Sequence, residues 1–167
     1  MIECWDNLLE VFGTDDGSLP DIELDHLSDD EVIRGYEFIR NHAARISSKQ
    51  PSYWSKSKDC DIPFGFEDNP AIKVVSGEAE SFHLRFDGFK SPSGKQIPEL
   101  GLFVFIDCLS FDYRMGPQWN KESLQGLFEL ISCMSKDYEN VKITHKTNIN
   151  DDDGSIFKKH WAAYQHA

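Results

Sequence analysis

Basic residues are missing from the first part of this sequence. The first lysine or arginine is Arg34, whereas acidic residues are frequent before it, and the chain of 167 residues carries a net charge of −12. A negative field of this kind repels nucleic-acid phosphates and anionic lipids, so we expect neither nucleic acid nor a membrane as partner. It attracts basic proteins, although an acidic surface can also serve only to keep a protein soluble.

Long apolar runs and clustered cysteines are missing too. The longest uninterrupted apolar run is Leu102 to Ile106, whereas a membrane-spanning helix needs about 20 apolar residues. The start of the chain has neither the basic residues nor the apolar stretch of a signal peptide, so we expect a cytoplasmic protein. The four cysteines show no metal-binding spacing. We predict free thiols, because a chain of this length can build a stable core without disulfides.

Motifs of known catalytic sites are also absent. No serine stands in a G-x-S-x-G context, and the glycines form no nucleotide-binding loop. We interpret the glycines, Gly101 among them, as turn residues. The acidic run at 151–153 lacks the ligand spacing of an EF-hand calcium loop. The sequence therefore predicts no catalytic residue, no metal and no cofactor. The enzymatic alternative is a small hydrolase that uses His83 or His145 with a nearby carboxylate.

The hydrophobic pattern predicts an α+β fold. Helical periodicity covers 2–12, 28–46, 120–134 and the residues after 155, and strand patterns cover 21–27, 71–75, 81–86, 102–106, 109–113 and 141–149. Residues 49–68 have no regular pattern and are expected to form a loop. We predict a single domain, residues 1–167, in which about four helices flank a largely antiparallel central sheet of about five or six strands.

Two segments in the second half of the chain are rich in aromatic residues. Leu102 to Ile106 is apolar at every position, which predicts a central strand covered on both faces. In residues 111–119, strand alternation places Asp112 and Arg114 on one face of the strand and Tyr113 on the other. This second segment is either a strand end sealed by an aromatic plug or the rim of a binding site, because Trp, Tyr and Arg anchor many interfaces.

The same segments resemble a known group of proteins. Residues 98–105, followed by 111–116, Trp119 and the predicted helix after it, are similar to the small cytosolic immunity proteins of bacterial polymorphic toxin and contact-dependent growth inhibition systems. The similarity covers roughly the second half of the chain. It implies a protein that is not an enzyme, binds one cognate toxin domain, often a nuclease, and blocks its active site.

The acidic N-terminal third fits this implied role, because a toxin that binds nucleic acid offers a basic cleft. The expected partner is therefore a basic toxin domain, held by charge and shape complementarity. The expected contact residues are acidic or aromatic: Asp15, Asp16, Asp21, Glu23, Asp25, Asp29, Asp30, Trp54, Tyr113 and Trp119. An acidic adaptor module for another basic protein is a third possibility.

Overall fold

The computed structural model describes residues 5–147 and 152–167, and it confirms the α+β fold class. Its helices are α1 (Asp6–Gly13), α2 (Asp29–His42), α3 (Ala71–Val75), α4 (Lys121–Ser135) and α5 (Asp152–Gln165). The central sheet has the order β10-β1-β9-β8-β5-β2 and is antiparallel throughout. Its strands are β1 (Asp21–Asp25), β2 (Arg45–Ile46), β5 (Phe82–Asp87), β8 (Leu100–Val104), β9 (Leu109–Tyr113) and β10 (Lys142–Lys146).

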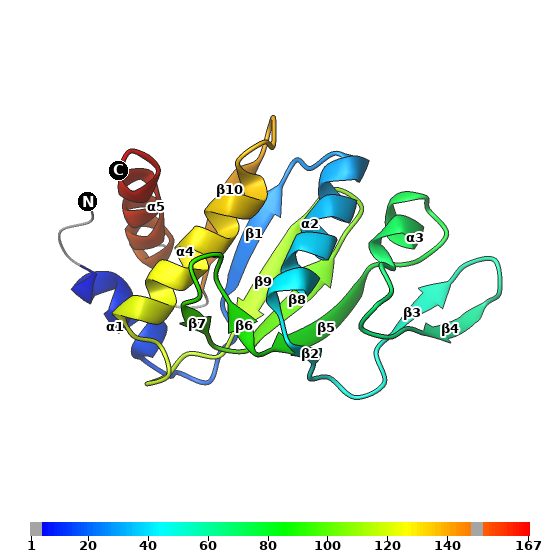
Figure 1. Cartoon of the computed structure of the whole chain (residues 1–167), viewed down its shortest axis with the longest axis horizontal. Helices are drawn as coiled ribbons and strands as arrows, with labels where there is room; N and C mark the ends of the chain where they lie inside the picture. The colour runs from blue at the N-terminus through cyan, green and yellow to red at the C-terminus, as the bar shows by residue number, and fades with distance from the viewer. Residues whose placement is uncertain (1–4, 148–151) are drawn as a thin grey trace.

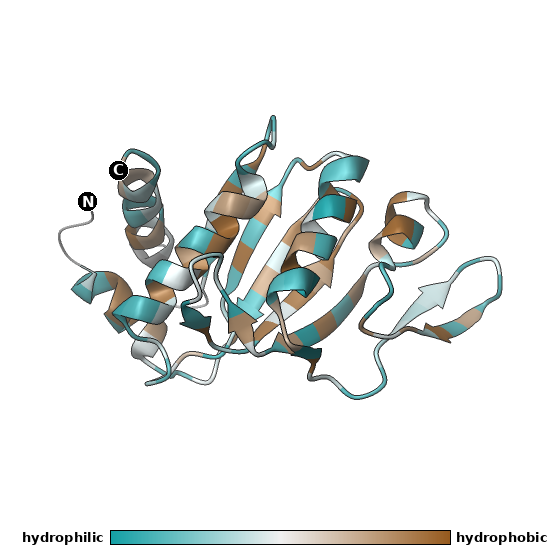
Figure 2. Ribbon diagram, in the orientation of Figure 1, coloured by the Kyte–Doolittle hydropathy of each residue, from teal (hydrophilic) through white to brown (hydrophobic). Residues whose placement is uncertain are grey.

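Two short hairpins complete the fold, β3 (Ser52–Ser55) with β4 (Cys60–Pro63) and β6 (Phe89–Lys90) with β7 (Gln96–Ile97). The helices α2 and α4 lie across one face of the sheet, α1 and α5 lie towards its β10 end, and the β3–β4 hairpin extends the other end (Figure 1). Figure 2 shows apolar residues along the central strands behind α2, whose outward side is largely hydrophilic. Within the described residues, no helix is both long and apolar enough to cross a membrane.

The core lies between the sheet and the helix layer, and α2 packs tightly against its neighbours at Gly35. A Cβ atom added there would lie 2.5 Å from Leu109 Cδ1 and 2.7 Å from the Tyr138 hydroxyl. At the β10 end, Phe12 of α1 stacks on Tyr113 with ring centroids 4.4 Å apart, and the Trp119 ring meets both edge-on. This confirms the aromatic plug at the end of β9.

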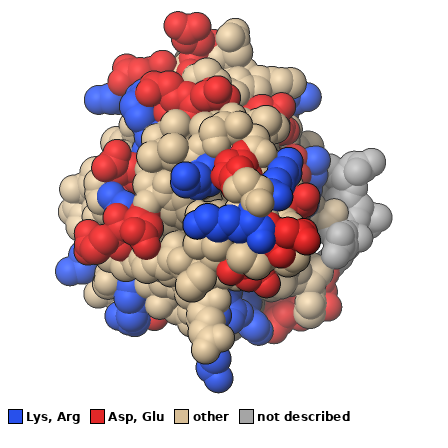
Figure 3. Space-filling model, turned by 90° about the vertical axis from the view of Figure 1, so that its right-hand side faces the viewer, with Lys and Arg blue, Asp and Glu red and all other residues tan. Residues whose placement is uncertain are grey.

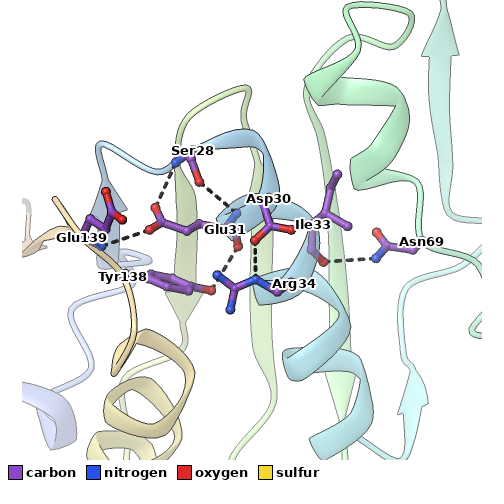
Figure 4. Close-up of polar contacts among 8 residues, drawn as sticks. All are labelled: Ser28, Asp30, Glu31, Ile33, Arg34, Asn69, Tyr138 and Glu139. Atoms are coloured by element: carbon purple, nitrogen blue, oxygen red, sulfur yellow. Dashed lines mark hydrogen bonds and ion pairs between the residues drawn. The ribbon is translucent and has the colours of Figure 1, made fainter.

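The start of α2 is fixed by a buried carboxylate (Figure 4). Ser28 and Glu31 form the capping box that the sequence predicts, and Glu31 is almost fully buried. Its carboxylate accepts hydrogen bonds from the backbone N–H of Ser28 at 2.9 Å and of Glu139 at 3.0 Å. The Tyr138 hydroxyl donates to the Glu31 carbonyl, also at 3.0 Å. These contacts tie α2 to the segment that connects α4 with β10.

Three secondary-structure predictions were wrong. Residues 71–75 form α3 and not a strand, because Pro70 suits a helix start and a short apolar run fits either state. The predicted loop at 49–68 contains the β3–β4 hairpin. The helix predicted to reach residue 46 ends at His42, and Arg45 and Ile46 pair with β5 as β2. Residues 148 and 149 of the last predicted strand lie outside the described residues.

Candidate functional site

The face of the sheet that points away from the helices is not covered, and we call it the open face. The prediction that residues 102–106 are covered on both sides was therefore wrong. Leu102 and Val104 are fully buried beneath the helices, but Phe103, Phe105 and Ile106 are 36%, 37% and 55% exposed. The rings of Phe103 and Phe105 stack with centroids 5.7 Å apart. An exposed aromatic pair on a sheet face is typical of an interaction site.

Charged residues surround this aromatic pair in rows that follow the strand register. Two rows of paired residues on the open face cross β10, β1, β9, β8 and β5 in that order. The first row consists of Lys146, Asp21, Asp112, Gly101 and Arg85. The second row consists of Thr144, Glu23, Ser110, Phe103 and His83. The carboxylates thus come from β1 and β9 in the middle of the face. Basic side chains come from the flanking strands.

A buried carboxylate and a histidine meet in the middle of the open face. Asp112 is only 7% exposed, and its Oδ2 lies 2.5 Å from Nε2 of His83. To reach β5 from β9, the Asp112 side chain crosses β8 at Gly101, where any Cβ atom would overlap the carboxylate. The interpretation of Gly101 as a turn residue was therefore wrong: it lies within β8, and its missing side chain makes room for Asp112.

Beside Gly101 the open face is hollowed into a recess of about 330 Å³. It is lined by the charged or titratable residues His83, Arg85, Glu99, Asp112 and Arg114, together with Leu19, Pro98, Tyr113 and Gln118. The Nε atom of Arg85 lies 3.9 Å from a carboxylate oxygen of Glu99. The recess therefore brings together charged groups of both signs from three strands and their ends.

The carboxylates in the middle of the open face repel one another. Burial, and then the negative charges of Asp112 and Glu23, raise the pKa of Asp21 above its ordinary value. Glu23 has a partner of its own, because Lys146 Nζ lies 2.7 Å from its carboxylate, and this contact raises the pKa of Lys146. The charges of Lys146 and His83 offset part of this effect on Asp21.

The predicted acidic contact residues separate into three groups, of which Asp21, Glu23 and Asp25 of β1 lie on the open face. Asp15 and Asp16 accept hydrogen bonds within their own loop, and those from Ser18 lower the pKa of Asp16. Asp29 and Asp30 stand in the first turn of α2, where acidic residues favour the helix dipole. Asp30 also pairs with Arg34 at 2.5 Å.

Of the predicted aromatic contact residues, only Trp54 is accessible, with 41% of its surface exposed. It lies on β3, next to Tyr53, whose ring packs towards Phe64. Tyr113 and Trp119 are 1% and 4% exposed and belong to the aromatic plug. Seen from the side that carries the β3–β4 hairpin, basic and acidic side chains are interspersed, so on this side the acidic residues do not form a uniform patch (Figure 3).

The second histidine of the enzymatic alternative, His145, is buried and hydrogen-bonded. His145 lies on the helix-covered face, with Nε2 2.6 Å from the Tyr113 hydroxyl. Burial and the neighbouring Asp25 raise the pKa of the Cys108 thiol, which is the opposite of an activated nucleophile. Cys60, Cys108 and Cys133 are free cysteines. Among residues 5–147 and 152–167, no cluster of three or more His, Cys, Asp or Glu side chains is arranged to hold a metal ion.

The candidate site is thus an open sheet face that carries charged side chains of both signs and an exposed aromatic pair. The fold is similar to that of one chain in the crystal structure of the toxic C-terminal tip of CdiA from Pseudomonas aeruginosa in complex with immune protein. The TM-score is 0.52 at 13% identity, over 78% of this chain and 86% of that chain. No family model and no curated protein matches. The likeness agrees with the resemblance seen in the sequence, and at this identity it concerns the fold alone.

Proposed function

We propose that this chain is an immunity protein that binds and neutralises a cognate toxin domain, and that the open face is its binding surface. The observation that carries the proposal is the exposure of Phe103 and Phe105 on the open face of a sheet whose other face is buried, next to the exposed Ile106 in the turn between β8 and β9. Covering these side chains removes apolar surface from water, which is the main driving force of protein association. The similarity to a chain from a complex between a toxin and its immune protein supports the same function.

The charges of the chain favour a basic partner, such as a nuclease with a basic active-site cleft. Asp21, Glu23 and Asp25 would contact it directly, with Trp54 at the hairpin as a further anchor. Asp15, Asp16, Asp29 and Asp30 would act at longer range and increase the association rate. The proposed mechanism is occlusion of the toxin's active site by a cytoplasmic protein, with no catalytic step, metal or cofactor.

The test is capture of a partner from lysate of the source cells, followed by a growth assay. Tagged protein is immobilised, and bound proteins are released with salt and identified by mass spectrometry. The captured domain is then expressed alone and together with this chain. We expect toxicity from the domain alone and normal growth on co-expression. A captured domain that is not toxic would favour the acidic adaptor module.

The contact surface is tested by reversing the charge of Asp21, Glu23 and Asp25 to lysine. A matched control makes the same change in net charge on the helix-covered side, at three exposed positions, Glu37, Glu122 and Asp137. We expect the β1 variant to lose protection and the control to retain most of it. Equal loss in both variants would show that net charge matters and that the open face does not.

A small hydrolase is the second candidate, and the structure favours His83 over His145 for it. His83 has a carboxylate partner and borders a recess, whereas His145 is buried against Tyr113. An imidazole oriented by a carboxylate is the arrangement of a general base. His83→Ala with unchanged activity in a panel of ester and phosphodiester substrates would remove this candidate, and loss of an activity would establish it.

A further inference from the structure

Two of the five arginines, Arg85 and Arg114, line the recess beside Gly101, and within the described residues neither has a hydrogen-bonded acidic partner. The other three of the five arginines are engaged: Arg34 with Asp30, Arg40 with the carbonyls of residues 67 and 68, and Arg45 with Asp87. Arg85 forms a long ion pair with Glu99, in which its Nε atom lies 3.9 Å from the carboxylate, beyond hydrogen-bonding distance. The structure gives the Arg114 side chain no ion pair with any residue in the described part of the chain, and both arginines line the recess.

The buried carboxylate that lines the recess, Asp112, forms its ion pair with His83 and with neither of these arginines. The Asp112 carboxylate lies within hydrogen-bonding distance of His83, and it occupies the space that a side chain at position 101 would fill. Arg114 is fixed through its backbone, because its carbonyl accepts hydrogen bonds at 2.8 Å from both Gln118 and Trp119. The main chain of Arg114 is thus held in place at the edge of the recess before any ligand arrives.

We propose that the recess binds an oxyanion, namely the carboxylate of an acidic side chain on the protein partner. A guanidinium group offers paired N–H donors that match the two oxygens of a carboxylate, and such hydrogen bonds are among the strongest in proteins. This inference rests on the proposed function. It specifies the partner further: a mainly basic contact surface that carries at least one acidic residue opposite Arg114.

A contact of this kind fixes the register of the complex. The acidic row along β1, which consists of Asp21, Glu23 and Asp25, would by itself attract any basic protein, including proteins that are not the cognate partner. An arginine beside that row repels a uniformly basic surface, and only a partner with an acidic residue at the matching position satisfies both. Opposite charges at defined positions give specificity, because like charges in contact are strongly unfavourable.

The test is the sign of the effect of Arg114→Glu on affinity for the captured toxin domain. For a uniformly basic partner, removing a positive charge from this protein would tighten binding. For the proposed contact, R114E should weaken binding about tenfold or more, which corresponds to about 1.4 kcal/mol. The matched control is Lys90→Glu on β6, exposed and outside the recess, which should not weaken binding. Unchanged or tighter binding by R114E would overturn the proposal, while the proposed function would stand.

The free protein provides a second measurement that needs no partner. ¹⁵N-labelled protein is titrated with malonate, and with sodium chloride at equal ionic strength. We expect saturable shifts for Gly101 and Gln118 with malonate only, and their loss in Arg114→Gln. Shifts that are absent, or that persist in R114Q, would overturn the oxyanion site. Localised shifts combined with full partner affinity in R114E would assign the recess to a free small anion and overturn the contact with a partner carboxylate.

Discussion

Replacing Gly101 by alanine tests whether the contact between His83 and Asp112 depends on the missing side chain in β8. The alanine Cβ would overlap the Asp112 carboxylate, which must then move away from His83. A hydrogen bond to a charged group contributes about 1.5–3 kcal/mol, but the His83 side chain is partly exposed and water replaces some of the loss. We therefore expect G101A to lower the free energy of unfolding by about 1–2 kcal/mol.

The assay is urea unfolding at pH 7 of G101A, Asp112→Ala and the double variant. In the D112A background the obstructing carboxylate is gone, so G101A should have little effect or stabilise by about 0.5–1 kcal/mol, since glycine is unfavourable within a strand. The difference between the two backgrounds is the coupling energy, which we expect to be about 1–3 kcal/mol. An equal cost of G101A in both backgrounds would refute the proposed steric cause.

Three further predictions concern α2 and the acidic row. Gly35→Ala should destabilise by about 1–3 kcal/mol, because its Cβ would collide with Leu109 and Tyr138; an unchanged urea midpoint would contradict this close packing. Tyr138→Phe should cost about 1 kcal/mol through loss of the hydrogen bond to the Glu31 carbonyl, measured by the same assay. Asp21→Asn should stabilise the protein at pH 7. The folded-state pKa of Asp21 is raised above the ordinary value of 3.8, so ionised Asp21 destabilises the folded protein only as the pH rises above 3.8. The stability gained in D21N should therefore disappear below that pH.

Much of the fold follows from local patterns in the sequence. The alternation at 109–113 gives β9 with its observed bounds, and the capping box at Ser28 gives the start of α2. The short apolar segment at 71–75 does not decide between helix and strand, because five residues satisfy both periodicities. The β3–β4 hairpin was missed because its strands are mostly polar and pair only with each other at the edge of the molecule.

The open face was missed for a different reason. A run such as Leu102–Ile106 has the composition of a strand buried on both sides, and whether a second layer covers it depends on where distant helices pack. One local signal was present: Gly101 lies next to this apolar run, and a glycine within a strand often marks the close approach of another group. That group is the side chain of Asp112, and its partner His83 is 29 residues away in the sequence.

Aromatic residues show the same limit. Trp119 and Phe103 are both large and apolar, yet the first seals the end of β9 and the second faces solvent. Residue type does not separate an interface anchor from a core plug, because both roles use the same side chains. The position of each residue relative to the helix layer decides, and that position is a property of the whole fold.

Two features of the open face are unfavourable for the free protein, and a single event would relieve both. The charges of Asp112 and Glu23 disfavour the ionised form of Asp21, and Phe103 and Phe105 expose apolar rings to water. A cation placed opposite Asp21 would offset the repulsion, and the surface that carries it would cover the rings. Residues that destabilise the folded chain and lie together on one face are typical of a site shaped by binding and not by folding. This coincidence favours a macromolecular partner over a small ligand, because only an extended surface reaches the acidic row and the aromatic pair together.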